Sequence, residues 1–152
     1  MLASPRCRIA RIAATAAVLS ATMAGPAFAA DADPQLAAVA REARQAIAVI
    51  EWFYVQHHAC PQPSRPADLA ELRSELGDGY AVEPQGQFVS IRGISMALGW
   101  LYYSAPDHPD KCTLWRRLGW DPALIWRRHR GGARWVLDPG DGSAERTLKI
   151  VP

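Results

Sequence analysis

The segment that follows residue 33 places apolar side chains at spacings of three and four, the period of one face of an α-helix. Asp33 followed by Pro34 is a strong helix start, because the carboxylate can cap free N–H groups and proline fits the first turn. After Pro34, neither proline nor glycine interrupts the segment before Cys60-Pro61, so the pattern predicts one long helix ending near His58. Its apolar stripe consists of Leu36, Ala40, Ala43, Ile47, Ile50 and Tyr54.

Shorter apolar patterns fill the middle of the chain. Three leucines followed by Gly77 predict a short second helix, since glycine favours the left-handed conformation that often ends one. Residues 80–83 and 87–92 are expected to form a hairpin around Gln85-Gly86. The apolar run 96–103 fits either a strand or a buried helical turn. The leucines of the second helix are Leu69, Leu72 and Leu76.

The last third of the chain alternates apolar and polar residues with the period of a β-strand. Residues 123–130 and 133–138 flank Gly131-Gly132, a pair suited to the positive φ angles of a two-residue hairpin turn. In that register the facing pairs are Arg128 with Trp135 and Trp126 with Leu137. The apolar residues on one side of this hairpin are predicted to lie in the core: Leu124, Trp126, Trp135 and Leu137.

Together these elements predict an α+β fold. One long N-terminal helix and a short second helix would pack on an antiparallel sheet of about four to six strands. Residues 146–151 are the last expected strand.

The N-terminal region has the three parts of an export signal. Three arginines precede an apolar stretch, and Ala27-Phe28-Ala29 offers the small residues that a signal peptidase reads. The apolar stretch has about 14 residues, fewer than the roughly 20 that span a bilayer, so a membrane anchor is the weaker interpretation. We predict a cleaved signal peptide over residues 1–29, a single α+β domain over residues 30–152 without a membrane span, and a periplasmic or secreted location.

Removing the leader changes the charge balance. The whole chain has 17 Lys plus Arg and 15 Asp plus Glu, but three arginines lie in the leader, so the mature chain has a net charge of −1 rather than +2. Residues 30–110 have a net charge of −6, whereas residues 111–152 have a net charge of +5. This asymmetry predicts a bipolar surface.

The cysteines point to one disulfide bond. Cys7 leaves with the leader, and Cys60 and Cys112 enter an oxidising compartment as a pair, so we predict that they are bonded to each other. A metal site made of His57, His58 and Cys60 is the alternative. It is disfavoured because adjacent residues of a helix project about 100° apart, and a disulfide-bonded cysteine cannot bind a metal.

Six tryptophans in the mature chain suggest ligand contact, since tryptophan is enriched at binding surfaces. Core packing is the preferred interpretation for most of them. The expected places are the hairpin core for Trp126 and Trp135, the crowded end of the long helix for Trp52, and the surroundings of the disulfide for Trp115 and Trp120. The places of Trp100, Tyr102 and Tyr103 are left open.

A basic group surrounds the tip of the last hairpin. Its arginines cannot all be neutralised locally, so they could bind a protein or another anionic partner of the cell envelope. A solvated edge whose charges prevent strand-to-strand aggregation is the preferred interpretation. No aromatic residues interleave the charges on the exposed side, so nucleic acid is not an expected partner. The candidate binding residues are Arg127, Arg128, Arg130 and Arg134.

Catalytic and metal-binding patterns are weak. The residue types of a hydrolase triad occur close together in a proline-rich segment: Ser104, Asp107 and His108. An adjacent Asp and His in such a segment more often reflect solvation. Oxygen ligands for Ca²⁺ occur at a spacing that a plain turn explains better: Asp138, Asp141 and Glu145. We predict no catalytic residue, no metal site and no cofactor.

Part of the helical region resembles a known family, the type IV pilin-like and pseudopilin proteins. The likeness covers about residues 36–76 and rests on the runs 43–47 (ARQAI), 50–54 (IEWFY) and 57–61 (HHACP), with Leu69 and Leu72. It implies a helix packed on an antiparallel sheet in a head domain that often has a disulfide. Filament-forming pilins retain an apolar N-terminal helix half, whereas the predicted cleavage leaves a chain beginning Ala30-Asp31-Ala32-Asp33. The resemblance therefore implies a soluble pilin-like head.

These observations predict an exported, non-catalytic binding or protein-interaction domain of the cell envelope. One alternative is a small periplasmic hydrolase, which a cleft joining Ser104, Asp107 and His108 would favour. The other is a minor pilin-like component of an envelope assembly or DNA-uptake machine.

Overall fold

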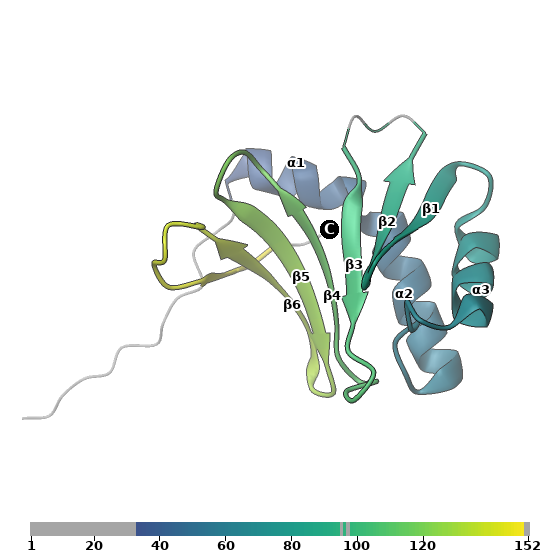
Figure 1. Cartoon of the computed structure of the whole chain (residues 1–152). Helices are drawn as coiled ribbons and strands as arrows, with labels where there is room; N and C mark the ends of the chain where they lie inside the picture. The colour runs from purple at the N-terminus through teal and green to yellow at the C-terminus, as the bar shows by residue number, and fades with distance from the viewer. Residues whose placement is uncertain (1–32, 95, 97, 151–152) are drawn as a thin grey trace, which may run out of the picture.

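The computed structural model describes residues 33–94, 96 and 98–150 (Figure 1). The helices are α1 (Pro34–Glu42), α2 (Arg44–His57) and α3 (Pro66–Leu76). The strands are β1 (Tyr80–Gln85), β2 (Phe88–Gly93), β3 (Trp100–Ser104), β4 (Cys112–Arg117), β5 (Ala123–His129), β6 (Gly132–Asp138) and β7 (Arg146–Leu148). The predicted signal peptide over residues 1–29 lies outside the described residues.

The strands form one antiparallel sheet in which each strand pairs with the next along the chain, from β1 to β7. The helices pack on one face of this sheet, and no element of the described part of the chain covers the other face (Figure 1). We call the uncovered side the open face. The predicted fold class is therefore wrong in two respects: three short helices replace one long and one short helix, and the sheet has seven strands rather than four to six.

The predicted long helix is divided at Ala43. There the N–H group of Ala43 bonds to the carbonyl of Ala40 at 3.1 Å, an i to i−3 contact that tightens the turn, and ψ is −7°. Ala43 is fully buried, so the bend occurs where the helical chain touches the core. Because no glycine or proline marks this position, packing rather than local propensity sets the break. Figure 1 shows the result, with α1 and α2 running in different directions behind the sheet.

The core lies between the helices and the covered face of the sheet. The predicted helical stripe is confirmed on the core side: Ala40, Ala43 and Ile50 are buried there, and Leu36, Ile47 and Tyr54 pack against the same cluster. The predicted core face of the last hairpin is also confirmed, since Leu124, Trp126, Trp135 and Leu137 all belong to this cluster. The α3 leucines complete it as predicted, with Gly77 following at a φ of +73°.

The strands of the last hairpin pair in a register that is shifted by two residues from the predicted one. His129 pairs with Gly132, so the turn is Arg130-Gly131, and Trp126 pairs with Trp135 instead of Leu137. Gly132 has a φ of +127°, which lets it act as the first residue of β6. Because side chains alternate between the two faces with a period of two, a shift of two residues leaves each side chain on its predicted face and changes only its cross-strand partner.

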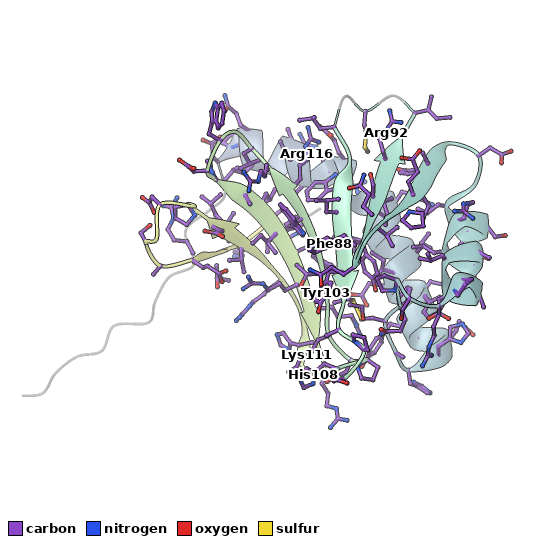
Figure 2. All side chains as sticks on the ribbon, viewed as in Figure 1. Phe88, Arg92, Tyr103, His108, Lys111 and Arg116 are labelled. Atoms are coloured by element: carbon purple, nitrogen blue, oxygen red, sulfur yellow. A yellow bond between two sulfur atoms is a disulfide. The ribbon has the colours of Figure 1, made fainter. Side chains whose placement is uncertain are left out.

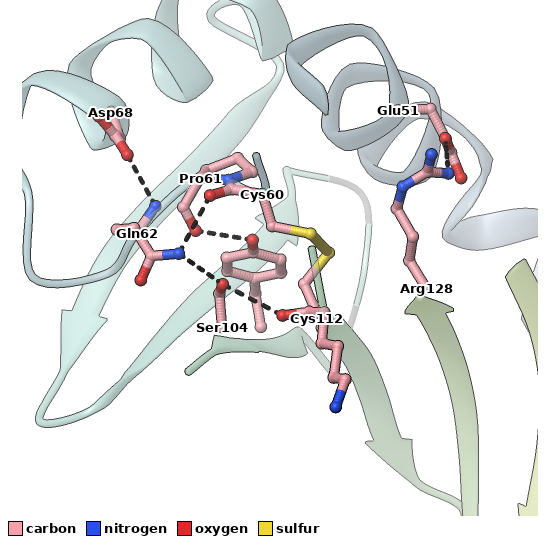
Figure 3. Close-up of a disulfide and its surroundings, with 10 residues drawn as sticks. Glu51, Cys60, Pro61, Gln62, Asp68, Ser104, Cys112 and Arg128 are labelled. Carbon is pink, nitrogen blue, oxygen red and sulfur yellow. Dashed lines mark hydrogen bonds and ion pairs between the residues drawn. A yellow bond between two sulfur atoms is a disulfide. The ribbon is translucent and has the colours of Figure 1, made fainter. Parts of the chain in front are cut away.

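The predicted disulfide between Cys60 and Cys112 is confirmed and joins the loop after α2 to the first residue of β4 (Figure 3). Buried polar groups lie beside it. The Tyr102 hydroxyl donates to the Pro61 carbonyl at 2.7 Å, and burial raises the pKa of this phenol well above its usual value. The Gln62 amide donates to the Ser104 hydroxyl at 2.8 Å. These bonds fix the loop to the sheet.

Candidate binding site

The predicted arginine tip is divided between the two faces of the sheet. Arg127 and Arg134 are cross-strand partners, so they point to the same face of the sheet. This is the open face, because the neighbouring pair, Trp126 and Trp135, lies in the core. Arg128 points the other way, where it pairs with Glu51 of α2 (Figure 3). Arg130 is exposed in the turn. The structure therefore does not bring the four predicted residues into one cluster.

Arg127 has its own carboxylate partner. Its two terminal nitrogens donate to the two oxygens of Glu145 at 2.5 and 2.6 Å. This hydrogen bonding raises the pKa of Arg127 and lowers the pKa of Glu145. Among the described residues, Arg130 and Arg134 form no ion pair. Of the four predicted arginines, these two therefore present the positive charge that a partner could contact.

Half-buried aromatic side chains lie on the open face. The Phe88 ring is 5.7 Å from the Tyr103 ring and 6.4 Å from the Trp115 ring, measured between centroids. Figure 2 shows Phe88 and Tyr103 close together on the side of the sheet away from the helices. Next to them, Trp115 packs against Ile125 in a small cluster of its own. This surface is apolar, yet the helices do not cover it.

A hollow of about 430 Å³ lies on the open face beside Trp115. This volume is within the range of roughly 300–1,000 Å³ found for small-molecule sites. The buried side chain of Ile125 lines it from the sheet, and the indole of Trp120, in the loop between β4 and β5, lines it from the rim. Trp120 is 92% exposed, which leaves a large apolar surface in contact with water.

Thr113 adds a hydroxyl group to this hollow. Its charged groups are two arginines and two aspartates: Arg117, Arg127, Asp121 and Asp138. Arg117 donates through Nη1 to the Trp120 carbonyl at 3.0 Å, which ties the guanidinium to the Trp120 loop. Asp138 accepts from the Gly140 N–H group at 2.9 Å. The formal charges of the four side chains cancel. The hollow therefore offers both hydrogen-bond donors and acceptors without a net charge.

The wall of the hollow depends on Gly140. This residue has a φ of +77°, and a Cβ atom added there would lie 2.2 Å from the carbonyl oxygen of Asp121. The loop between β6 and β7 can therefore approach the loop between β4 and β5 only because residue 140 has no side chain. Gly142, in the same loop, also has a positive φ of +84°, but a Cβ atom there would meet nothing within 4 Å.

A second hollow of about 250 Å³ adjoins the first. Leu98 and Leu101 give it a mainly apolar lining, and Leu98 is 57% exposed. Arg116 also lines it, but its guanidinium pairs with Glu42 of α1. Trp115 and Arg117 line both hollows. The two hollows therefore lie side by side, with Trp115 and Arg117 between them, and we refer to the pair as the elongated site.

The hydrolase residues do not assemble into a site. Ser104 is buried, and its hydroxyl accepts from Gln62 and donates to the Lys111 carbonyl at 3.2 Å. Asp107 and His108 are exposed in the following loop (Figure 2 labels His108). The hydroxyl thus serves to hold the disulfide loop.

The alternative metal-binding groups also have other partners. Cys60 is in the disulfide, and His57 lies 2.8 Å from Glu71 of α3. Hydrogen bonding from the Ser143 side chain, together with the Ser143 N–H group, lowers the pKa of Asp141. Within residues 33–94, 96 and 98–150, no group of three or more His, Cys, Asp or Glu side chains is placed to hold a metal ion.

Three tryptophans lie where the sequence did not place them. Trp120 is in an exposed loop rather than beside the disulfide, and Trp52 is 38% exposed on α2 rather than buried at the helix end. Trp115 faces the open side of β4. Trp100, whose place was left open, is buried in the main core. The alternation of Thr113, Trp115 and Arg117 was the available signal for the site, but β4 was not recognised as a strand.

No family model, curated protein or solved structure matches this chain. The resemblance to type IV pilin-like proteins over residues 36–76 therefore stays a prediction. None of the helices in the described part of the chain is both long and apolar enough to cross a membrane.

Proposed function

We propose that this protein is an exported, non-catalytic binding domain of the cell envelope that holds its ligand on the open face of the sheet, around Trp115. The asymmetry of the sheet carries this proposal. Helices cover one face, whereas the other face keeps aromatic side chains half-exposed beside an elongated hollow. Exposed apolar surface next to a concave site is characteristic of binding surfaces in soluble proteins.

Export is supported by the leader pattern of residues 1–29 and by the disulfide. Disulfides form and persist in oxidising compartments such as the periplasm. The Cys60–Cys112 bond is consistent with that environment. A binding role is favoured over the hydrolase alternative because the Ser104 hydroxyl is buried and already bonded on both sides.

Cosedimentation with envelope particles from the native host tests this proposal. The protein is expressed with its own leader, purified from the exported fraction and mixed with the particles. We expect the wild type to pellet with them, and Trp115→Ala to lower the apparent affinity by about tenfold, because interface energy concentrates in a few aromatic residues. Trp120→Ala is a second test variant, since its exposed side chain contributes little to the fold.

Trp52→Ala is the matched control. It removes a partly exposed tryptophan from α2, on the covered side of the sheet, and should leave the affinity unchanged. An equal loss in Trp52→Ala and Trp115→Ala, or no association of the wild type with the particles, would contradict the proposal.

A further inference from the structure

We propose that the elongated site around Trp115 binds a neutral oligosaccharide. This inference rests on the proposed function and names the class of ligand. It follows from three properties of the site: its indole surfaces, its balanced polar groups and its shape.

The indole surfaces suit a sugar ring. Trp115 lies at the middle of the site and Trp120 at its exposed rim. One face of a pyranose presents C–H groups, which pack on an aromatic ring, while the hydroxyl groups at its edge stay free for hydrogen bonds. Tryptophan combines a large apolar area with this tolerance of a polar neighbour. A ligand of this kind would cover the Trp120 surface that is now 92% exposed.

The polar groups suit hydroxyls rather than ions. Arg117 and Arg127 can only donate hydrogen bonds, and the ionised carboxylates of Asp121 and Asp138 can only accept them. A hydroxyl group does both, so neighbouring hydroxyls of one ring can satisfy both kinds of partner. Few other neutral ligands carry so many such groups beside an apolar face.

The charge balance disfavours ionic ligands. In the two hollows, Arg117 and Arg127 are offset by Asp121 and Asp138, and Arg116 pairs with Glu42 of α1. Beside them, the added carboxylate of Glu145 is matched by Arg134, the cross-strand neighbour of Arg127. A phosphate-bearing ligand or a nucleic acid needs an excess of positive charge, because its affinity comes largely from phosphate contacts. A cation would meet the two guanidinium groups. A ligand without net charge meets no such penalty.

The shape indicates more than one sugar unit. The hollows of about 430 and 250 Å³ share Trp115 and Arg117, so one molecule can extend from the polar hollow into the apolar one. Leu98 and Leu101 in the second hollow suit the apolar face or substituent of a following unit. An oligosaccharide fills both hollows, whereas a monosaccharide fills one.

A glycan array tests the inference. The probe is the whole exported protein, and the array carries neutral, acidic and phosphorylated oligosaccharides on one surface. We expect binding to neutral oligosaccharides, with at least about tenfold weaker signals for Trp115→Ala and Trp120→Ala and no change for Trp52→Ala. Gly140→Ala should also weaken binding, because its Cβ atom would push the wall away from Asp121. Gly142→Ala is its control, because residue 142 also has a positive φ but its new methyl group would meet no neighbouring atom.

The outcomes separate this inference from the proposed function. Neutral oligosaccharides that also displace the protein from envelope particles would support both. If the particles bind through Trp115 but no neutral glycan on the array binds, the site is a binding surface and the saccharide inference is wrong. Binding confined to acidic or phosphorylated glycans, or to an added single-stranded oligonucleotide, would overturn it as well.

Discussion

The guanidinium carbon of Arg128 lies 3.7 Å from the centroid of the Tyr54 ring, across the interface between the sheet and α2. The same guanidinium pairs with Glu51, one helical turn earlier. Its side chain is only 13% exposed. Arg128 thus joins β5 to α2, and a residue that the sequence suggested for partner binding is part of the internal packing of the protein.

Replacing Arg128 should therefore destabilise the fold. In Arg128→Met the apolar stem is kept, but the cation–π contact and the Glu51 pair are lost. We expect the free energy of unfolding to fall by about 1–3 kcal/mol, measured by urea denaturation. Arg130→Met is the control, and this exposed turn position should change stability by less than about 0.5 kcal/mol. Equal effects of the two substitutions would show that Arg128 has no special structural role.

The disulfide should contribute more than any single side-chain contact. It closes a loop of 52 residues in sequence separation, and restricting an unfolded chain over this length stabilises the fold by about 4 kcal/mol in the chain-entropy model. The double variant Cys60→Ser with Cys112→Ser should lose about this amount, again measured by urea denaturation. Intact mass after alkylation under denaturing, non-reducing conditions provides the check. Labelling of either cysteine in the native exported protein would show that the bond is absent.

The Arg127–Glu145 pair should make stability depend on acid pH. Arg127 lowers the pKa of Glu145 in the folded protein, so the unfolded chain binds a proton at higher pH than the folded chain does. The contribution of the pair is therefore present at neutral pH and is lost as pH falls through the lowered pKa. It is small, because the Glu145 side chain is 41% exposed and solvent screens it.

Urea midpoints measured from about pH 6 to about pH 2 would show this dependence, since the range spans the titration of carboxyl groups. Glu145→Gln should flatten the curve relative to wild type. Glu75→Gln, which removes an exposed carboxylate without an ion pair among the described residues, should leave it unchanged. A Glu145→Gln curve parallel to that of wild type would contradict the assignment.

Sequence reasoning predicted well the elements that have one solvent-exposed side and one buried side. The helical stripe and the Trp126 and Trp135 face could be read because polar residues mark their outer sides. The break at Ala43 could not be read, since a buried alanine has high helix propensity and only packing on the sheet bends the chain there. The predicted hairpin register was wrong because the two adjacent glycines allow a turn at either Arg130-Gly131 or Gly131-Gly132.

The candidate site was missed for a related reason. The two-residue spacing of Thr113, Trp115 and Arg117 was present, but both faces of β4 mix apolar and polar residues, so the sequence Cys112–Arg117 was not recognised as a strand. Without that strand, Trp115 and Arg117 cannot be placed on the open face. Trp120 and Asp121 lie in a loop whose position depends on the close approach of Gly140, a contact distant in sequence. Local patterns carry no information about such a contact.

Two arginines at the hairpin tip, Arg130 and Arg134, form no ion pair within the described part of the chain. Arg130 and Arg134 are exposed, so they can attract the particle surface through long-range charge while the Trp115 site makes the contact. We expect the association with envelope particles to weaken as salt rises, because salt screens exposed charges beyond about 10 Å at 0.1 M. In the double variant Arg130→Ala with Arg134→Ala this salt dependence should become shallower, while the loss caused by Trp115→Ala should persist at high salt. Arg41→Ala with Arg44→Ala removes two exposed arginines, one from α1 and one from α2, and controls for total charge. If both double variants flatten the salt dependence equally, net charge rather than the hairpin tip determines the attraction.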